Sequence, residues 1–168
     1  MELPHRIAAG GLVFQEDSIL LVRYRGTREG ETFLAAPGGG LKDDENIAQA
    51  VIREIREETG VTVAPRRLLA IEDIRFPKLK MIKLWMLCDL RDGELRRTEG
   101  AVREGILETA WFPRDRLSGE AVYPALLLPR DWDNLRHGER PVEILPSREV
   151  TDGPAYPYRG GRDPGIRG

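Results

Sequence analysis

The chain has 168 residues, which is the size of one domain and is long enough to bury a hydrophobic core. Its 28 acidic and 26 basic residues leave a formal net charge of −2, which argues against nucleic acid or an acidic membrane surface as a partner. No apolar run approaches the length of a membrane span, the N-terminus lacks the features of a signal peptide, and the single Cys88 cannot form an internal disulfide. We therefore expect a cytoplasmic protein.

The first third of the chain alternates apolar runs with turns. These runs predict strands over residues 7–14, 18–24 and 32–36. Arg23 and Arg25 follow the second run and alternate with Tyr24, so they should share one face. The segment Pro37-Gly38-Gly39-Gly40 then predicts a tight loop rather than a strand or helix, in which the backbone can approach a ligand closely.

A helix is predicted over residues 45–59. Asp43 or Asp44 would cap its start, and Gly60 suits the left-handed position after its end. An apolar stripe on this helix should face the core and consists of Ile47, Ala48, Val51 and Ile55. On the same helical wheel Glu58 lies inside this stripe and not opposite it, so its carboxyl group is expected at a buried position.

The same helix carries an acidic cluster. Glu54, Glu57 and Glu58 stand at i, i+3 and i+4, so they share a face, and the last two lie in the turn where the helix dipole repels carboxylates. A solvated helix face is the alternative interpretation. However, Arg53 alone cannot neutralise three carboxylates, and a hard divalent ion with oxygen ligands fits better. The pattern favours Mg²⁺ that keeps several waters and a substrate phosphate, with Mn²⁺ as a substitute.

The rest of the chain continues with strands, predicted over residues 61–71, 81–90 and 109–112. Trp85 and Trp111 lie in these runs and are expected in the core. A second helical segment is predicted over residues 120–128, where Pro124 restricts it. Residues 147–168 are rich in Pro and Gly and have too few apolar groups to fold alone. We therefore expect a domain over residues 1–146 followed by an arm or tail.

The segment from Gly39 to Val61 reads Gly-x5-Glu-x7-Arg-Glu-Ile-x-Glu-Glu-x-Gly-Val. It resembles the Nudix box of the Nudix hydrolase family at every defining position, and the flanking runs Ala8 to Phe14 and Trp111-Phe112-Pro113 agree. The resemblance implies an α/β protein, an α/β/α sandwich with a mixed central sheet. One departure is Lys42, which stands where many members carry an acid.

The resemblance also implies roles for individual residues. Glu54, Glu57 and Glu58, with the backbone carbonyl of Gly38, would hold one to three ions, and Arg53 would orient the carboxylates. Glu104 or one of the box glutamates would accept the proton of the attacking water, and Glu108 is a second candidate in the same stretch. The substrate-binding candidates, each weighed against an ordinary structural role, are Arg23, Gly39 and Gly40.

The implied function is Mg²⁺-dependent hydrolysis of the diphosphate linkage in a nucleoside diphosphate joined to another group. The substrate would be a nucleotide sugar such as ADP-ribose, or a nucleoside triphosphate. The alternatives are a nucleotide-binding sensor without turnover and a hydrolase of RNA 5′ ends. ADP-ribose-cleaving members often have a proline at about the place of Pro77, but here Lys78 replaces the glycine that frequently follows it. An ordinary role of Pro77 in a turn between two strands is therefore the alternative interpretation.

The arm offers a further expectation about assembly. Tyr156, Pro157 and Tyr158 supply aromatic anchors of low rotamer freedom among prolines. We predict that the arm packs on its own domain or on a second copy and that the protein is a homodimer. The alternative is a tail without a role.

Overall fold

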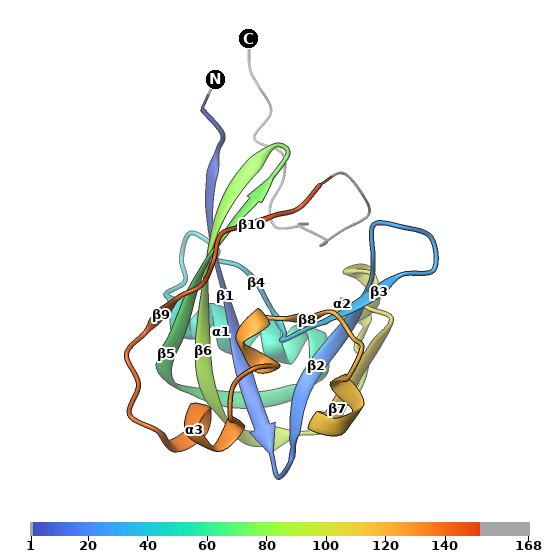
Figure 1. Ribbon diagram of the computed structural model, residues 1–168, viewed down its shortest axis with the longest axis vertical. Helices are drawn as coiled ribbons and strands as arrows, with labels where there is room; N and C mark the ends of the chain where they lie inside the picture. The colour runs from blue at the N-terminus through green and yellow to red at the C-terminus, as the bar shows by residue number, and fades with distance from the viewer. Residues whose placement is uncertain (1, 152–168) are drawn as a thin grey trace.

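The computed structural model describes residues 2–151 (Figure 1). Within them, ten strands form one mixed sheet. The strands are β1 His5–Gln15, β2 Ser18–Arg25, β3 Thr32–Ala35, β4 Gly38–Gly40, β5 Val61–Phe76, β6 Leu79–Gly93, β7 Glu108–Pro113, β8 Val122–Tyr123, β9 Glu143–Ile144 and β10 Arg148–Glu149. The helices are α1 Ile47–Thr59, α2 Glu99–Arg103 and α3 Trp132–His137, with short 3₁₀ turns η1 Arg114–Leu117 and η2 Ala125–Leu127.

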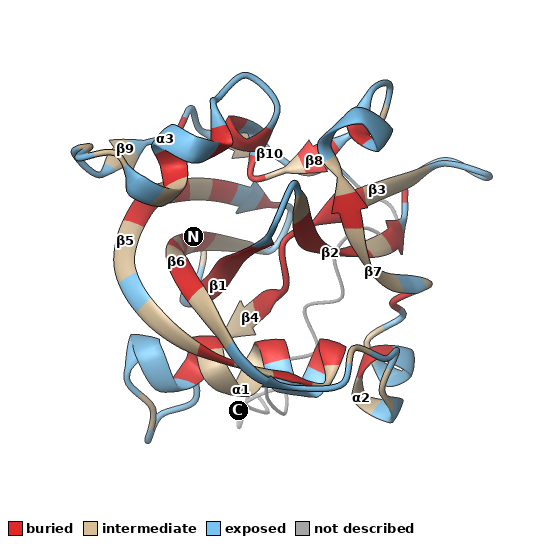
Figure 2. Ribbon diagram, turned by 90° about the horizontal axis from the view of Figure 1, so that it is seen from below, coloured by how far each residue is buried: buried red, intermediate tan, exposed pale blue. Residues whose placement is uncertain are grey.

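The sheet is mixed, and β1 is its central strand. The strand order is β10-β5-β6-β1-β2-β3-β8, while β4 pairs with β1, β7 with β2 and β9 with β5. The pairing of β1 with β6 is parallel, whereas β1 pairs antiparallel with β2 at its end and with β4 near its start. The sheet curls strongly, with α1 packed below it (Figure 2). The predicted α/β class with a mixed sheet is confirmed.

Helix α1 begins two residues later than the sequence predicted. Its N-cap is Asn46, whose side chain accepts from the backbone N–H of Gln49, while the Gln49 side chain accepts from the Asn46 N–H. This reciprocal capping box satisfies two otherwise unpaired donors, which neither Asp43 nor Asp44 does here. The predicted end is correct, because Gly60 lies at the C-cap with φ 81°.

The face that α1 buries is shifted from the predicted stripe. Its buried residues are Ala50, Val51, Ile55, Glu58 and Thr59. Ile47 and Ala48, in the first turn of the helix, are exposed. The expectation for Glu58 is confirmed, since only 3% of this residue is exposed. The helix therefore carries an ionisable group into the core.

Two predicted segments have a different structure. Gly38–Gly40 is not a loop but a short strand that pairs with residues 8–10 of β1, since the absence of side chains lets it lie flat against its neighbour. Residues 120–128 form β8 and the 3₁₀ turn η2 instead of a helix. There, pairing with β3 sets the conformation up to Tyr123, and Pro124 starts the turn. The short helices α2 and α3 were not predicted.

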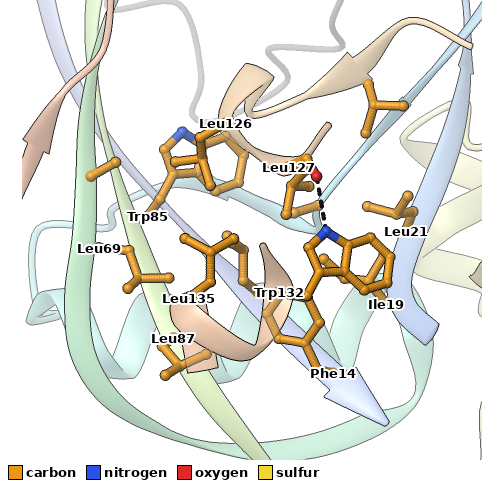
Figure 3. Packing of buried hydrophobic residues seen from close by; sticks show 14 of the residues in the cluster. Phe14, Ile19, Leu21, Leu69, Trp85, Leu87, Leu126, Leu127, Trp132 and Leu135 are labelled. Carbon is orange, nitrogen blue, oxygen red and sulfur yellow. Dashed lines mark hydrogen bonds between the residues drawn. The ribbon is translucent and has the colours of Figure 1, made fainter. Parts of the chain in front are cut away.

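The largest hydrophobic cluster fills the concave side of the curled sheet. The indole N–H of Trp132 in α3 donates to the Leu127 carbonyl at 2.8 Å, and its ring lies 5.3 Å from that of Phe14 (Figure 3). Trp85 is fully buried in the same cluster, as predicted. Trp111 is only partly buried. It packs against a second hydrophobic cluster, to which α1 contributes Ala50, Val51 and Ile55.

The first residues of the predicted arm belong to the sheet. Arg148 and Glu149 form β10, which pairs in parallel with β5, and the Val150 N–H donates to the Arg75 carbonyl at 2.9 Å. Tyr156, Pro157 and Tyr158 lie outside the described residues. No helix within residues 2–151 combines the length and apolar composition that a membrane span needs. Cys88 is buried with a free thiol, and burial raises its pKa to about 12.

Candidate functional site

The guanidinium of Arg53 joins α1 to the glycine strand β4. It donates to the Gly40 carbonyl at 3.0 Å and to Glu54 at 2.6 Å. It also forms a two-pronged ion pair with Glu45, one contact of which measures 2.8 Å. Two parallel hydrogen bonds of this kind fix the orientation of the guanidinium and also stabilise the charges of both groups. Arg53 therefore sets the position of the Glu54 carboxylate relative to the strand.

Glu45 is the main partner of Arg53 and is mostly buried, with 13% of its side chain exposed. The hydrogen bonds from Arg53 lower the pKa of Glu45 to about 2, and they raise the pKa of Arg53. Both groups therefore stay charged over the whole range in which the protein would work. The pair is a permanent link between the residues before α1 and the middle of the helix.

Glu54 lies against the second glycine of β4. A Cβ atom added at Gly39 would meet the Glu54 carboxyl atoms at 2.7 Å, so no other residue fits there without displacing this carboxylate. Burial raises the pKa of Glu54, and its bond to Arg53 opposes that rise. The glycine thus provides the space in which an acidic group is held next to the backbone of β4.

Glu58 is the most deeply buried acid of α1. It accepts from the Gly38 N–H at 3.3 Å, which is its contact to β4. Burial raises the pKa of Glu58 well above its usual range, and the neighbouring charge of Glu54 adds to the rise. Burial disfavours the anionic form of both carboxyl groups, so a nearby positive charge would stabilise them as anions.

Two further charged residues act on Glu58 from other elements. Lys83 of β6 is fully buried, and its ammonium lies 4.3 Å from the centre of the Trp85 ring. Its positive charge lowers the pKa of Glu54 and Glu58 and so opposes the effect of burial. Glu104, at the C-cap of α2, raises the pKa of Glu58. The candidate base from the distal segment therefore acts electrostatically on the acidic cluster.

Glu57 lies apart from this buried pair. Its side chain is 53% exposed and accepts from Arg53 at 3.2 Å. Across residues 2–151, no three His, Cys, Asp or Glu side chains stand in an arrangement that would hold a metal ion. The structure therefore brings Glu54, Glu58 and Gly38 together and leaves Glu57 on the outer side of Arg53.

Arg23 is bound by two acids on the other side of the sheet. It donates to Glu108 at 2.9 Å and to both oxygens of Glu120 at 3.0 Å, and also to Thr32 at 3.0 Å. The hydrogen bond with Glu120 raises the pKa of Arg23. A direct phosphate contact would have to replace one of these partners.

One hollow borders the acidic cluster, and a second opens elsewhere on the sheet. One, of about 1010 Å³, runs along α1 and α2 and is lined by Arg53, Glu57 and the basic residues Arg56, Arg96 and Arg103. The other, of about 430 Å³, opens between the β2–β3 connection, β8 and β10. Its size lies within the range of small-molecule sites, about 300–1,000 Å³.

Several residues of the site were not singled out from the sequence. Glu45 is a fixed position of the Gly39 to Val61 pattern, so its pairing with Arg53 had a signal that was left unassigned. Lys83 interrupts an apolar run, which is a signal for a buried charge. No sequence pattern indicated the pairing of Glu72 with Arg148, because these residues lie 76 positions apart in the chain.

Comparison with known proteins places this arrangement in context. A model of the NUDIX domain matches residues 4–133. The chain is 31% identical over 118 residues to an ADP-ribose pyrophosphatase of Methanocaldococcus jannaschii, covering 69% of each protein. It is 32% identical over 112 residues to a putative ADP-ribose pyrophosphatase of Bacillus subtilis, covering 64% of this chain and half of that protein.

A solved structure gives the same picture of the fold. A crystal structure of an ADP-ribose pyrophosphatase from Streptococcus suis superposes with a TM-score of 0.59 at 24% identity, covering 83% of this chain and 98% of that one. The similarity extends over nearly the whole of the smaller protein.

The ion pair of Glu45 with Arg53 predicts a pH-dependent stability. Because the folded-state pKa of Glu45 is lowered, its stabilisation is complete above pH about 4.5 and is lost as pH falls towards 2. We expect Glu45→Gln to unfold more easily than wild type at pH 7, by about 1.5–3 kcal/mol, with a smaller difference at pH 3. Denaturant unfolding at both pH values measures this, with exposed Glu29→Gln as control. A difference that is the same at both pH values contradicts it.

The contact of Gly39 with Glu54 predicts a local defect. Since the added Cβ would meet the end of a side chain and not the backbone, Gly39→Ala should displace Glu54 and leave the fold intact. We expect Mn²⁺ binding, measured by calorimetry, to weaken by about 10-fold or more, with little change in melting temperature. In a Glu54→Ala background the same change should have no further effect. An additive loss in the double variant would assign the defect to another group.

Proposed function

Because the chain belongs to the Nudix family of pyrophosphohydrolases, we propose that it uses Mg²⁺, or Mn²⁺ in its place, to hydrolyse a nucleoside diphosphate joined to another group. A nucleotide sugar such as ADP-ribose is the first candidate, since that activity is in the names of the relatives in Methanocaldococcus jannaschii and Bacillus subtilis. A nucleoside triphosphate is the second. The observation that carries the proposal is the pair of carboxyl groups, buried Glu58 and mostly buried Glu54, against the strand Gly38–Gly40.

The residues present fit a hard divalent cation. Glu54 and Glu58 offer carboxylate oxygens in a largely buried place, where burial raises the pKa of both and the negative charge of Glu54 adds to the rise at Glu58. Oxygen ligands of this kind are what Mg²⁺ prefers. Glu57 and the carbonyl of Gly38 complete the proposed set, for which Glu57 would exchange its bond with Arg53. A bound ion supplies charge neutralisation at the diphosphate and lowers the pKa of the attacking water.

The chain's own residues contribute positioning and proton transfer. Arg53 donates hydrogen bonds to Glu54 and to the Gly40 carbonyl, so it would orient the acidic cluster and would take no part in bond breaking. The backbone of Gly39 and Gly40 would approach the diphosphate, because neither residue has a side chain of its own. Glu104, or one of the helix glutamates, would take the proton of the attacking water. We assign Arg23 to holding Glu108 and Glu120 and not to direct phosphate binding.

The Glu58→Gln variant tests whether the protein is an enzyme or a nucleotide-binding sensor. The change keeps volume and hydrogen bonding but removes one buried ligand charge, so we expect turnover of ADP-ribose to fall at least about 10²-fold. Released phosphate species from a panel of nucleotides give the measurement. Glu99→Gln serves as the matched control, because its side chain is 97% exposed.

Thermal melts of the wild type with and without Mg²⁺ accompany this test, and we expect millimolar Mg²⁺ to raise the midpoint. Full activity of Glu58→Gln, or wild-type activity in excess EDTA, would show the assigned site to be wrong. A wild type that binds nucleotides tightly and cleaves none would support the sensor.

We also propose that the protein is a cytoplasmic homodimer in which residues after Thr151 take part. The measurement is the solution mass of the full chain and of a chain ending at Thr151, by light scattering. We expect the full chain to be dimeric and the shortened chain to be monomeric or less stable. Equal masses and equal melting temperatures would remove any role of these residues in assembly.

A further inference from the structure

The last turn of α1 has backbone carbonyls that the helix itself does not pair, because the chain turns directly into β5. The Gly60 N–H closes the helix by donating to the Arg56 carbonyl at 3.0 Å. The carbonyls of Glu57, Glu58 and Thr59 follow it in the chain. Two of these three belong to residues whose side chains are candidate metal ligands, so the groups that bind these carbonyls lie close to the candidate site.

All three carbonyls accept hydrogen bonds from one later segment, which contains α2 and the start of β7 (Figure 2). The hydroxyl of Thr98 donates to the Glu57 carbonyl. The hydroxyl of Thr109 donates to the Glu58 carbonyl at a longer 3.4 Å, and the Arg96 N–H donates to the next carbonyl of the helix at 3.0 Å. The end of α1 is therefore capped by a segment that lies far away in the sequence.

Glu104 lies between the two threonines of this segment, at the C-cap of α2. Its charge acts on Glu58, so the candidate base lies within electrostatic range of the acidic cluster. Ala101 and Ile106, on either side of it, are buried in a cluster with residues of β2 and β3. The core contacts thus fix this segment to the sheet, whereas the threonine hydroxyls fix it to α1.

Thr98 makes two hydrogen bonds through one hydroxyl group. As the N-cap of α2, its oxygen accepts from the Ala101 N–H at 3.0 Å, while its O–H donates to the Glu57 carbonyl. A hydroxyl has one proton and two acceptor lone pairs, so both bonds can form at once. Because α2 has only five residues, it is too short to be stable alone, and such contacts set its position.

Gly100 allows α2 to approach α1 this closely. A Cβ atom at this position would lie 2.6 Å from the Glu57 carbonyl oxygen and 3.4 Å from the Thr98 hydroxyl oxygen. Since the nearer atom belongs to the backbone, no side-chain rotation could relieve the clash. Glycine is a poorer helix former than alanine, so the close approach, and not helix propensity, explains this residue.

We propose that Thr98 is a positioning residue for Glu104. Its hydroxyl, in the space that Gly100 leaves, fixes α2 against the last turn of α1, so Glu104 is held at a set place relative to the glutamates of that turn. This inference rests on the proposed function, in the form in which Glu104 takes the proton of the attacking water. Without the hydroxyl, α2 keeps its contacts with β2 and β3 but loses its attachment to the helix that carries the candidate metal ligands.

The first test compares Thr98→Val, which removes the hydroxyl and keeps the shape, with Thr98→Ser, which keeps the hydroxyl. Turnover of ADP-ribose by the full chain with Mg²⁺ is measured. We expect Thr98→Val to lower kcat about tenfold or more and to leave KM within about twofold, because only the placement of the base changes. Thr98→Ser should restore kcat, and Mn²⁺ affinity by calorimetry should stay unchanged in both variants. Thr62→Val is the matched control, since it makes the same change on β5 in the wall of the same hollow.

A second comparison separates positioning from the loss of a helix cap. Gly100→Ala keeps the Thr98 hydroxyl and favours the helix but pushes α2 away from α1, so kcat should fall as in Thr98→Val. In a Glu104→Gln background neither change should lower kcat further. An additive loss in the double variants, equal losses in Thr98→Val and Thr98→Ser, or wild-type kcat in Thr98→Val would overturn the proposal. Should Thr98→Val fail to fold by circular dichroism, Gly100→Ala decides by the same criteria.

Hydrogen exchange of the amides of residues 101–106 tests the attachment of α2 without any turnover. We expect exchange at least about tenfold faster in Thr98→Val than in wild type or Thr98→Ser, and equal exchange would overturn the attachment. A wild type that cleaves no nucleotide overturns the proposed function, while faster exchange in Thr98→Val would still support the attachment. An active wild type whose Glu104→Gln variant keeps full turnover overturns the role of Thr98 and leaves the hydrolase standing.

Discussion

The position of the candidate site depends on the hydrogen bonds that Arg53 makes to both sides of the α1–β4 contact. One side is a strand of three glycines that has no side chains with which to anchor itself, and the other is a helix that carries buried acids. Arg53 binds the Gly40 carbonyl, Glu45 and Glu54 at once, so strand, connection and helix share one fixed point. Without it, Glu54 would repel its acidic neighbours with nothing to set its direction.

The molecule also buries ionisable groups in its interior, which is costly unless each has a partner. Glu58, Glu72 and Lys83 are each at most 3% exposed. Glu72 is satisfied by Trp85 and Arg148, whereas Glu58 has one long bond to Gly38 and a raised pKa. The two acids therefore differ in environment: both oxygens of Glu72 accept hydrogen bonds from side chains, and Glu58 accepts from the backbone of Gly38.

The sequence could predict those features that depend on residues close to one another along the chain. The end of α1 at Gly60 and the burial of Glu58 follow from helical geometry, and the pattern from Gly39 to Val61 indicated the family that the domain match confirms. The N-cap was wrong although Asn46 and Gln49 carried the capping-box signal. The strand at Gly38–Gly40 and the pairing of Arg148 with Glu72 depend on contacts with distant segments, which no local pattern contains.

The parallel pairing of β1 with β6 has a consequence for how the molecule is made. Residues 8–10 of β1 pair with β4 and also with residues 83–85 of β6. The strand that holds the glycine strand in place therefore needs a second partner that lies 75 positions later in the chain. Closing so large a loop is slow compared with forming α1 or the β5–β6 hairpin. During synthesis on the ribosome, a nascent chain that ends between Val61 and Lys83 therefore has the whole box but lacks the β6 residues that pair with β1 beside the glycine strand.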